Sequence, residues 1–287
     1  AFKTMAEIPA EPKPEVLERR LTFLGLQGMI DPARPEVKVA VGKAKKAGLK
    51  SIMITGDYRD TAQAIAGQIG MLTEGGKVVT GAEVDAMTDD ELDGMVLHLD
   101  TCARSSPQHK MRIVDALKRR DHVVAMTGDG VNDAPALKRA NIGVAMGITG
   151  TDVTKQTADM VLTDDNYASI VSAIEEGRVI YSNIRKFVFY LISCNIGEIL
   201  IIFSSMVAGL PLPLRPIQLL LLNLVTDGAP ALALSMEKGD PGTMKRPPRP
   251  VKEPVLNHDM RLGILVQSTT MAVGVMLAFL YGLNAYP

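Results

Sequence analysis

The pattern of apolar and polar positions divides the chain into two parts of different character. Up to about residue 186, short apolar runs alternate with longer stretches that carry apolar residues at helical spacing. Strands that alternate with helices favour a parallel, doubly wound sheet. Three long apolar runs follow, at 187–210, 217–236 and 262–283, and each is close to the ~20 residues that a helix needs to cross a bilayer. The pattern therefore predicts a soluble α/β domain followed by an all-α transmembrane region.

The elements of the α/β domain are predicted from apolar, strand-like runs and amphipathic, helix-like stretches. A Gly directly after 36–47 marks the carboxyl end of that helix. A Pro in the first turn of 107–119 marks the start of the other. Strands are expected at 22–29, 51–54, 99–103, 123–126, 142–146 and 160–162, and helices at 36–47, 61–69, 82–97, 107–119 and 134–140, with one more between 146 and 160.

The junction between the two parts has no strong helix breaker. Residues 166–186 are helix-like and run directly into the first apolar segment, so one continuous helix would join the soluble domain to the membrane. The alternative is that Gly177 ends one helix and a second helix begins there. An isolated Gly costs a helix only about 1 kcal/mol, which favours continuity.

Composition and charge narrow the class of protein. The net charge of −1 gives no field that would attract nucleic acid. The two cysteines lie in different parts and are expected to be buried free thiols, as on a cytosolic side. Residues 1–20, rich in Pro and Glu, are interpreted as the end of one domain and a linker; residues 21–185 form the α/β domain and 186–287 the transmembrane region. The chain begins without an initiator Met, so we expect a fragment of a longer protein.

The distribution of Lys and Arg predicts the orientation of a multi-pass integral membrane protein. Basic residues flank the first apolar run on its amino-terminal side and fill the connection between the second and third runs, whereas the short connection 211–216 holds only Arg215. The positive-inside rule then places the soluble domain on the cytosolic side. The basic residues in question are Arg178, Arg185, Lys186, Lys238, Lys245, Arg246, Arg249 and Lys252.

The strongest chemical signal is the segment 126–135, Met-Thr-Gly-Asp-Gly-Val-Asn-Asp-Ala-Pro. The apolar run before it predicts a buried strand that delivers Asp129 and Asp133 to a loop at its carboxyl end, where open α/β sheets bind ligands. Two carboxylates with no Lys between them repel each other unless a cation is present, and magnesium favours such oxygen ligands together with phosphate. A short Gly-Asp-Gly alone is also a common turn, but the full string is far more specific.

Other predicted strand ends supply complementary groups. Thr55, Gly56 and Asp57 offer a hydroxyl and backbone amides to a phosphate oxygen, and Lys110 near a helix start can place a point charge on a phosphoryl group. Arg104 precedes that helix and could pair with another phosphate. Alone, Lys110 would be an ordinary solvated lysine. With the paired carboxylates, these groups indicate a phosphoryl-transfer site.

The first two apolar runs carry polar side chains that are costly inside a membrane. Asn195 and Glu198 share one helix face, and Asn223, Thr226 and Asp227 share another. An acid at the bilayer centre costs ~2.5–3.5 kcal/mol on insertion scales, so interhelical hydrogen bonding alone is the less favoured explanation. Gly228 and Pro230 should unwind the second helix just after its polar cluster and free carbonyls for a cation.

These motifs resemble a known family. The order of Thr55-Gly56-Asp57, Lys110 and 128–133 is similar to the haloacid-dehalogenase-like, Rossmann-like fold, and with Asp31-Pro32, Ser106–Lys110 and 151–159 the chain resembles the phosphorylation domain of P-type ATPases over essentially its whole length. The resemblance implies that Asp129 holds Mg²⁺ with Asp133 and Asn132 beside it, that Lys110 stabilises phosphoryl charge and that the Thr55 hydroxyl binds phosphate. The implied nucleotide and phosphate site comprises Thr55, Gly56, Asp57, Arg104, Lys110 and Asn132.

The family's nucleophile, the Asp of an Asp-Lys-Thr-Gly-Thr string, is absent from this sequence. The resemblance implies that it lies upstream of Ala1, with a nucleotide domain inserted after it. We therefore expect that this chain alone does not hydrolyse ATP and that its sheet lacks a central strand. The implied partners are the remaining nucleotide and actuator domains and the other membrane helices of the same pump.

The membrane motifs resemble the sarco/endoplasmic-reticulum type of calcium pump. Sodium/potassium pumps have an acid where Asn223 stands, and plasma-membrane calcium pumps lack the acid at Glu198. The resemblance implies an ATP-driven pump that couples an aspartyl phosphate to Ca²⁺ transport across the lipid bilayer. Another cation (sodium, proton or manganese) and a non-catalytic membrane protein that keeps the fold are the alternatives. The implied calcium ligands are Asn195, Glu198, Asn223, Thr226 and Asp227.

Overall fold

The computed structural model describes residues 2–5, 11, 13–28 and 32–285 and divides into two units, Ala1–Arg34 and Pro35–Pro287. The first unit contains helix α1 (Pro14–Leu17) and one antiparallel bridge between Phe2 and Thr22. The strand predicted at 22–29 is wrong for the described residues 22–28, because the bridge is the only pairing found there and a strand needs a neighbour for its backbone groups. Met29, the last residue of that predicted strand, and Asp31 of the Asp31-Pro32 motif lie outside the described residues.

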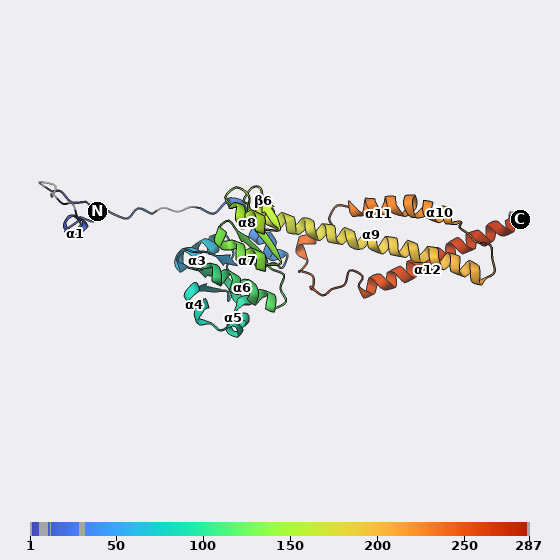
Figure 1. The fold of residues 1–287 in the computed structure, drawn as a ribbon, viewed down its shortest axis with the longest axis horizontal. Helices are drawn as coiled ribbons and strands as arrows, with labels where there is room; N and C mark the ends of the chain where they lie inside the picture. The colour runs from blue at the N-terminus through green and yellow to red at the C-terminus, as the bar shows by residue number, and fades with distance from the viewer. Residues whose placement is uncertain (1, 6–10, 12, 29–31, 286–287) are drawn as a thin grey trace. The chain divides into compact units, whose positions relative to one another are not determined.

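The α/β part of the second unit is built on parallel strands, as predicted (Figure 1). Three strands form one sheet in the order β1 (Met53–Ile54), β3 (Leu99–Ala103), β2 (Lys77–Thr80). Three more form a second sheet in the order β4 (Ala125–Gly128), β5 (Ile142–Met146), β6 (Met160–Leu162). In the described part of the chain, β1 and β4 therefore each have a strand on one side only. The single doubly wound sheet expected from the pattern is present as two halves.

Helices precede the first of these strands or connect successive strands, either within one sheet or from the first sheet to the second. They are α2 (Pro35–Lys46), α3 (Arg59–Gln68), α6 (Pro107–Arg119), α7 (Ala134–Arg139) and α8 (Asp152–Thr157), close to the predicted bounds. The helix predicted at 82–97 is wrong: it is divided into α4 (Gly81–Ala86), α5 (Asp89–Met95) and the 3₁₀ turn η1 (Val96–His98). Thr88 explains the break, because its hydroxyl accepts the Glu91 N–H while the Glu91 carboxylate accepts the Thr88 N–H, a capping box that starts a new helix.

Two apolar cores hold these layers together. Leu92, Leu99 and Ile113 are fully buried between the first sheet and helices α5 and α6. Val114 and Leu137 belong to a second cluster, which packs α6 and α7 against the second sheet. Because α6 contributes to both clusters, it fixes the two halves of the sheet relative to each other.

Helix α9 (Tyr167–Val207) runs for 41 residues without a break, so the prediction of one continuous helix is confirmed and Gly177 lies inside it. Its start is capped by Asn166, whose side-chain oxygen accepts the Ala168 N–H at 2.9 Å. Its first turns pack on α2, where Val171 joins Ala40 and Ala44 in a buried cluster. The rest of α9 packs against α11 and α12.

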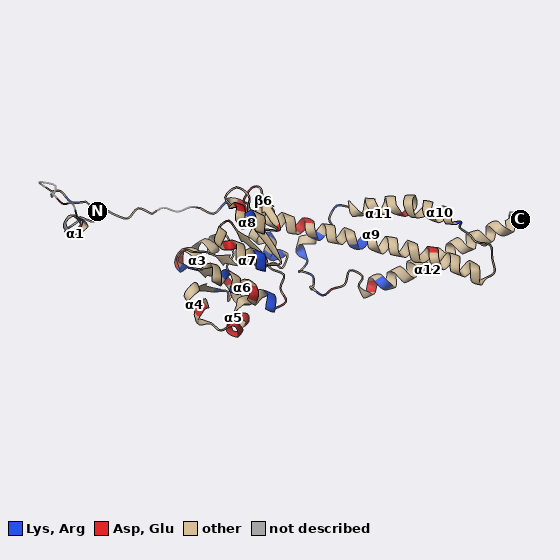
Figure 2. Cartoon of the chain, in the orientation of Figure 1, with Lys and Arg blue, Asp and Glu red and all other residues tan. Residues whose placement is uncertain are grey.

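The second apolar run forms α10 (Pro216–Leu221), the π-helical segment η3 (Leu222–Asp227) and α11 (Gly228–Ser235), and the third forms α12 (His258–Ala285). With α9, these give three helices long and apolar enough to cross a membrane, and Figure 2 shows few charges along them. The predicted unwinding at Gly228 is wrong, since Gly228 is helical (φ −66°, ψ −44°). Pro230 has no N–H for the Thr226 carbonyl, and the irregularity lies before it, within η3.

Candidate functional site

The loop after β4 is closed by one carboxylate. The Oδ2 atom of Asp133 accepts the backbone N–H groups of Asp129 and Gly130, each at 3.3 Å. Gly128 leaves the space for this turn, because a Cβ there would lie 2.4 Å from the Cβ of Asp133. The 3₁₀ turn η2 (Val131–Asp133) then leads into α7. The loop is therefore held in one shape by Asp133, which is buried.

Lys110 reaches this loop from the first turn of α6. Its Nζ atom lies 2.6 Å from Oδ1 of Asp133, and the two side chains are only 20% and 8% exposed. The start of α6 is fixed by His109, whose Nδ1 accepts the Ser106 N–H at 2.9 Å and whose Nε2 lies 2.9 Å from the Asp85 carboxylate. The structure thus brings together two of the predicted catalytic residues, and the sequence had not indicated that they form an ion pair.

Asp129 and Asn132 present exposed side chains at the same loop. The backbone carbonyl of Asp129 is held by the Thr151 N–H at 3.0 Å and the Thr154 hydroxyl at 3.3 Å, which leaves its carboxylate facing solvent. Within the described ranges, no three His, Cys, Asp or Glu side chains converge to hold a metal. Mg²⁺ is usually bound by one or two carboxylates together with phosphate oxygens, so one open carboxylate beside the residues predicted to bind phosphate fits that ion.

The loop after β1 is linked to the loop after β3. The Thr55 hydroxyl donates to the Asp57 carboxylate at 2.9 Å and accepts the Asp57 N–H at 3.1 Å. The Ser105 N–H donates to the Thr55 carbonyl and the Arg104 N–H to the Asp57 carbonyl, both at 3.0 Å. The guanidinium of Arg104 lies over the Tyr58 ring, 3.8 Å from its centre. In this conformation, Arg104 therefore contacts Tyr58 rather than the Lys110–Asp133 pair.

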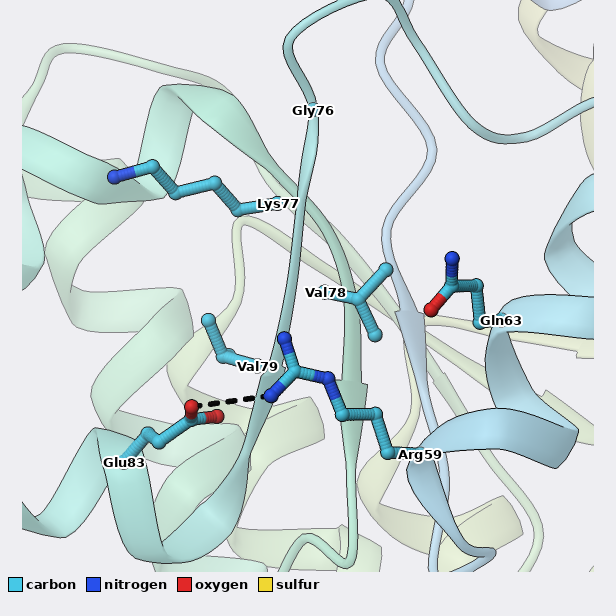
Figure 3. A pocket seen from close by; sticks show the side chains of 7 residues that line it. All are labelled: Arg59, Gln63, Gly76, Lys77, Val78, Val79 and Glu83. Carbon is cyan, nitrogen blue, oxygen red and sulfur yellow. Dashed lines mark hydrogen bonds and ion pairs between the residues drawn. The ribbon is translucent and has the colours of Figure 1, made fainter.

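A hollow of about 430 Å³ lies beside α3 and β2, and none of the residues that line it is a predicted site residue (Figure 3). Arg59 and Glu83 form an ion pair at 3.2 Å across it. The Glu83 carboxylate also accepts the Thr80 N–H at 2.6 Å, which lowers the pKa of that carboxyl. Arg59 and Glu83 are thus paired with each other, whereas the Lys77 side chain points away from them (Figure 3).

In the membrane part, the structure joins some of the predicted ligands. The Asn223 side-chain amide donates to Oε2 of Glu198 at 2.9 Å, across from η3 to α9. Asn195 instead donates back to the Leu191 carbonyl at 2.8 Å. Thr226 is exposed, and its carbonyl, left free by Pro230, accepts the Tyr190 hydroxyl at 3.0 Å. Sequence reasoning missed Tyr190, although a Pro four residues after a carbonyl is a signal that this carbonyl needs another donor.

Asp227 is buried in the same region. It is 5% exposed, and its Oδ2 atom has no hydrogen-bond partner. The Cys194 thiol of α9 is close enough to Asp227 for an electrostatic interaction. The sequence predicted a buried free thiol at Cys194, which is confirmed, but its position beside an acid could not be read from the sequence, because that proximity depends on how η3 is wound.

The base of α9 connects the α/β part to the membrane part. Arg178 donates to the carbonyls of Thr243 (3.1 Å) and Arg246 (2.9 Å) in the connection between α11 and α12, and to the carbonyl of Ala47 (2.9 Å) after α2. Asn183, one to two turns further along, donates to the Glu237 carbonyl at 2.6 Å. A single helix therefore contacts the soluble layer, the basic connection and the polar membrane cluster.

Comparison with known proteins gives the family. A family model described as "Cation transporting ATPase, C-terminus" matches residues 211–287, and two models described as "haloacid dehalogenase-like hydrolase" match 2–141 and 111–174. The "Calcium-transporting ATPase" of Bacillus subtilis is 50% identical over 269 residues. The chain belongs to the cation-transporting ATPase family. Its haloacid-dehalogenase-like part and its three apolar helices agree with a membrane-bound P-type ATPase.

Other members of the cation-transporting ATPase family are equally similar. The "Endoplasmic reticulum calcium ATPase srcA" of Aspergillus fumigatus is 50% identical over 92% of this chain, and the "P-type sodium-transporting ATPase4" of Toxoplasma gondii is 48% identical over 90%. The match to the Bacillus protein covers 94% of this chain. The chain spans only 30% of the length of the Bacillus protein, 28% of the Aspergillus protein and 20% of the Toxoplasma protein. The resemblance to the sarco/endoplasmic-reticulum type is thus supported by a relative of that name.

Proposed function

We propose that the chain is the phosphorylation and ion-binding part of an ATP-driven calcium pump, with its α/β domain on the cytosolic side of the membrane. The observation that carries this proposal is that one helix, α9, packs against the α/β part and also carries residues of the ion site. Its first turns pack against α2 in the layer that holds the phosphate-site residues, and its membrane part carries Glu198, which pairs with Asn223. Phosphoryl chemistry and ion binding would therefore be coupled mechanically through α9.

At the phosphate site, the chain's own groups have separate roles in this proposal. Lys110 stabilises charge on the transferred phosphoryl group and the Thr55 hydroxyl donates to a phosphate oxygen. Asp129 holds Mg²⁺, with Asp133 fixing the loop and Asn132 beside it, and that ion neutralises phosphate charge when bound. Gly56, Asp57 and Arg104 contribute to the nucleotide and phosphate site. The phosphorylated Asp and the nucleotide and actuator domains come from the remainder of the pump.

At the ion site, calcium is the proposed cargo. Glu198, Asp227 and Asn223, with Asn195 and Thr226, offer side-chain oxygens, which calcium accepts in numbers of six to eight. Three of the relatives named for calcium match at least 48% of positions. Sodium is the second candidate, because the Toxoplasma relative named for sodium is 48% identical; overall identity therefore does not select the ion.

The test is ATP-driven uptake of radioactive calcium into vesicles that contain the full-length protein. We expect uptake that Glu198→Gln or Asp227→Asn abolishes, and that Glu176→Gln, at an exposed acid on the same helix, leaves intact. ATP-driven sodium uptake without calcium uptake would overturn the choice of ion. ATP-independent behaviour, with no phosphoenzyme, would favour a non-catalytic membrane protein.

A further inference from the structure

His109 is a buried histidine that stands directly before Lys110 in the first turn of α6. The residue is 6% exposed, and both of its ring nitrogens have partners. Nδ1 accepts the Ser106 N–H at 2.9 Å, and Nε2 lies 2.9 Å from the Asp85 carboxylate of α4. The first turn of α6 is therefore tied both to the residue before it and to a different helix.

The imidazole fits into a slot that a glycine leaves open. A Cβ at Gly81, the first residue of α4, would lie 2.4 Å from Cε1 and 2.5 Å from Nδ1 of His109. A larger residue there would displace the ring. Asp85 stands one turn further along α4 and so shares a face with Gly81. One face of α4 therefore provides both the space for the ring and the partner for its Nε2 atom.

The two contacts fix which ring nitrogen carries the proton. Nδ1 accepts an N–H and so has no proton of its own, which places the ring proton on Nε2, where it donates to Asp85. The hydrogen bond at one ring nitrogen determines the role of the other. Asp85 thus keeps Nδ1 available as the acceptor that the Ser106 N–H needs.

The Ser106 backbone connects this cap to Lys110. The Ser106 N–H is bound by His109, and the Ser106 carbonyl accepts the Lys110 N–H at 3.3 Å. Further along α6, Ile113 and Val114 are buried in the two apolar cores, which anchor the body of the helix. Among the described residues of the first turn, 107–110, none belongs to these cores. The place of the first turn, and with it the direction of the Lys110 side chain, therefore depends on the cap.

We infer that His109 is a positioning residue for Lys110 in phosphoryl transfer. It holds the first turn of α6 so that the Lys110 ammonium stays at the loop after β4, 2.6 Å from Asp133. A displacement of about 1 Å at a reacting group can slow a reaction about 100-fold. The inference rests on the proposed function, because it needs Lys110 to act on a phosphoryl group.

The experiment follows phosphoenzyme formation from radioactive ATP by rapid quench, with the full-length protein in vesicles. The first-order rate constant reports the chemistry of each competent molecule, and the amplitude reports how many molecules are competent. His109→Leu should lower the rate constant about 10- to 100-fold. His109→Gln should restore most of it, because a Gln at the third helical position also accepts the N–H of the residue before the helix. His122→Leu, at an exposed histidine beyond the other end of α6, should match the wild type.

The two quantities separate positioning from folding. A wild-type rate constant with a lower amplitude in His109→Leu would show that the residue only stabilises the fold, and it would overturn the inference. If His109→Leu gives no competent molecules, Asp85→Ala decides, because the Asp85 side chain is 63% exposed and its loss lets the ring turn. We expect a lower rate constant in Asp85→Ala, and an unchanged one would overturn the inference.

The remaining outcomes separate the inference from the proposed function. If His109→Gln is as slow as His109→Leu, the acceptor for the Ser106 N–H is not what matters, and the inference is wrong while the pump assignment stands. If the wild type forms no phosphoenzyme, the proposed function is wrong, and the role of His109 falls with it.

Discussion

The ammonium group of Lys110 lies 2.6 Å from the Oδ1 atom of Asp133, and both side chains are largely shielded from water. Lys110 stands on the helix after β3, in the first sheet, and Asp133 on the loop after β4, in the second. The pair therefore joins the two halves of the α/β part at the strand ends where phosphate chemistry is proposed. It also explains how Asp133 can hold the loop as an anion while buried.

Replacing Lys110 tests both roles of this pair. Lys110→Met removes the cation and leaves the Asp133 charge buried without a partner, which typically costs about 3–5 kcal/mol. We expect a lower free energy of unfolding and loss of phosphoenzyme formation from ATP, measured by denaturant titration and by incorporation of radioactive phosphate in the full-length protein.

Two comparisons separate folding from chemistry in that experiment. Lys118→Met is the matched control, because Lys118 is on the same helix and donates to the Arg139 carbonyl at the surface; it should change neither quantity much. Lys110→Arg keeps a cation near Asp133 and should recover more stability than activity. Normal phosphoenzyme levels in Lys110→Met would contradict the proposed role.

The glycines of the loop after β4 provide a second, purely steric test. A Cβ at Gly128 would lie 2.4 Å from the Asp133 Cβ, whereas a Cβ at Gly130 would have its nearest neighbour at 3.7 Å. Gly128→Ala should displace Asp133 and destabilise the protein by about 1–3 kcal/mol, the usual cost of overpacking. Gly130→Ala should stay within about 0.5 kcal/mol of the wild type. Equal unfolding midpoints for the two variants would show that the loop can move freely.

Much of this part of the fold could be predicted from local pattern. The strands at 99–103, 142–146 and 160–162 and helix α6 begin and end at the predicted residues, because apolar runs and a Pro in the first turn mark them directly. Strand β2 was missed, since four residues starting with an exposed Lys carry too little alternation. The strand expected at 22–29 failed because strands also need a partner, which no local pattern guarantees.

Relations between distant residues were the part that the sequence could not provide. Lys110 and Asp133 were both predicted, but as separate contributors to a phosphate site. Their ion pair depends on how α6 crosses between two sheets. In the membrane, Glu198 and Asn223 were predicted as ligands, but their hydrogen bond and the π-helical winding of η3 were not. The Thr226 carbonyl, which lacks a donor from Pro230, accepts the Tyr190 hydroxyl from another helix.

Asp165 gives a prediction about pH. Although burial raises the pKa of its carboxyl, the N–H groups of Ile148, Thr149 and Gly147 and the Thr149 hydroxyl lower it from 3.8 to about 2. A lowered folded-state pKa contributes stability above the unfolded value, and this is lost as the pH falls through the folded value. Asp165→Asn should therefore lower the unfolding temperature near neutral pH, and the difference from wild type should shrink between pH 3.8 and about 2.

Asn is the suitable replacement there because residue 165 has a positive φ of 49°, which Asn tolerates better than most residues. Glu74→Gln, at an exposed acid in the loop before β2, is the comparison for a change of net charge alone. A difference between wild type and Asp165→Asn that stays constant from neutral to acidic pH would show that the charge of Asp165 does not stabilise the loop.

Arg178 should hold the connection between α11 and α12 against the base of α9. Its guanidinium donates to the Thr243, Arg246 and Ala47 carbonyls, and bonds from a charged donor each contribute about 1.5–3 kcal/mol. Arg178→Ala should release the connection and speed trypsin cleavage after Lys245, followed by gel electrophoresis and mass spectrometry. Glu176→Ala, exposed on the same helix, should not. Unchanged cleavage in Arg178→Ala would mean that other contacts hold the connection.

Asn223 provides the sharpest test of the ion site, because its amide donates to Glu198 at 2.9 Å and to the Leu219 carbonyl at 3.0 Å. Asn223→Leu keeps the volume but removes both a proposed ligand oxygen and the donor that orients the Glu198 carboxylate. Loss of such support typically weakens metal binding about 10- to 100-fold, so the calcium concentration for half-maximal phosphoenzyme formation should rise by that factor. Ser204→Ala, which removes only a bond within α9, should leave it unchanged. If Asn223→Leu keeps the wild-type calcium dependence, Glu198 does not need this partner to bind the ion.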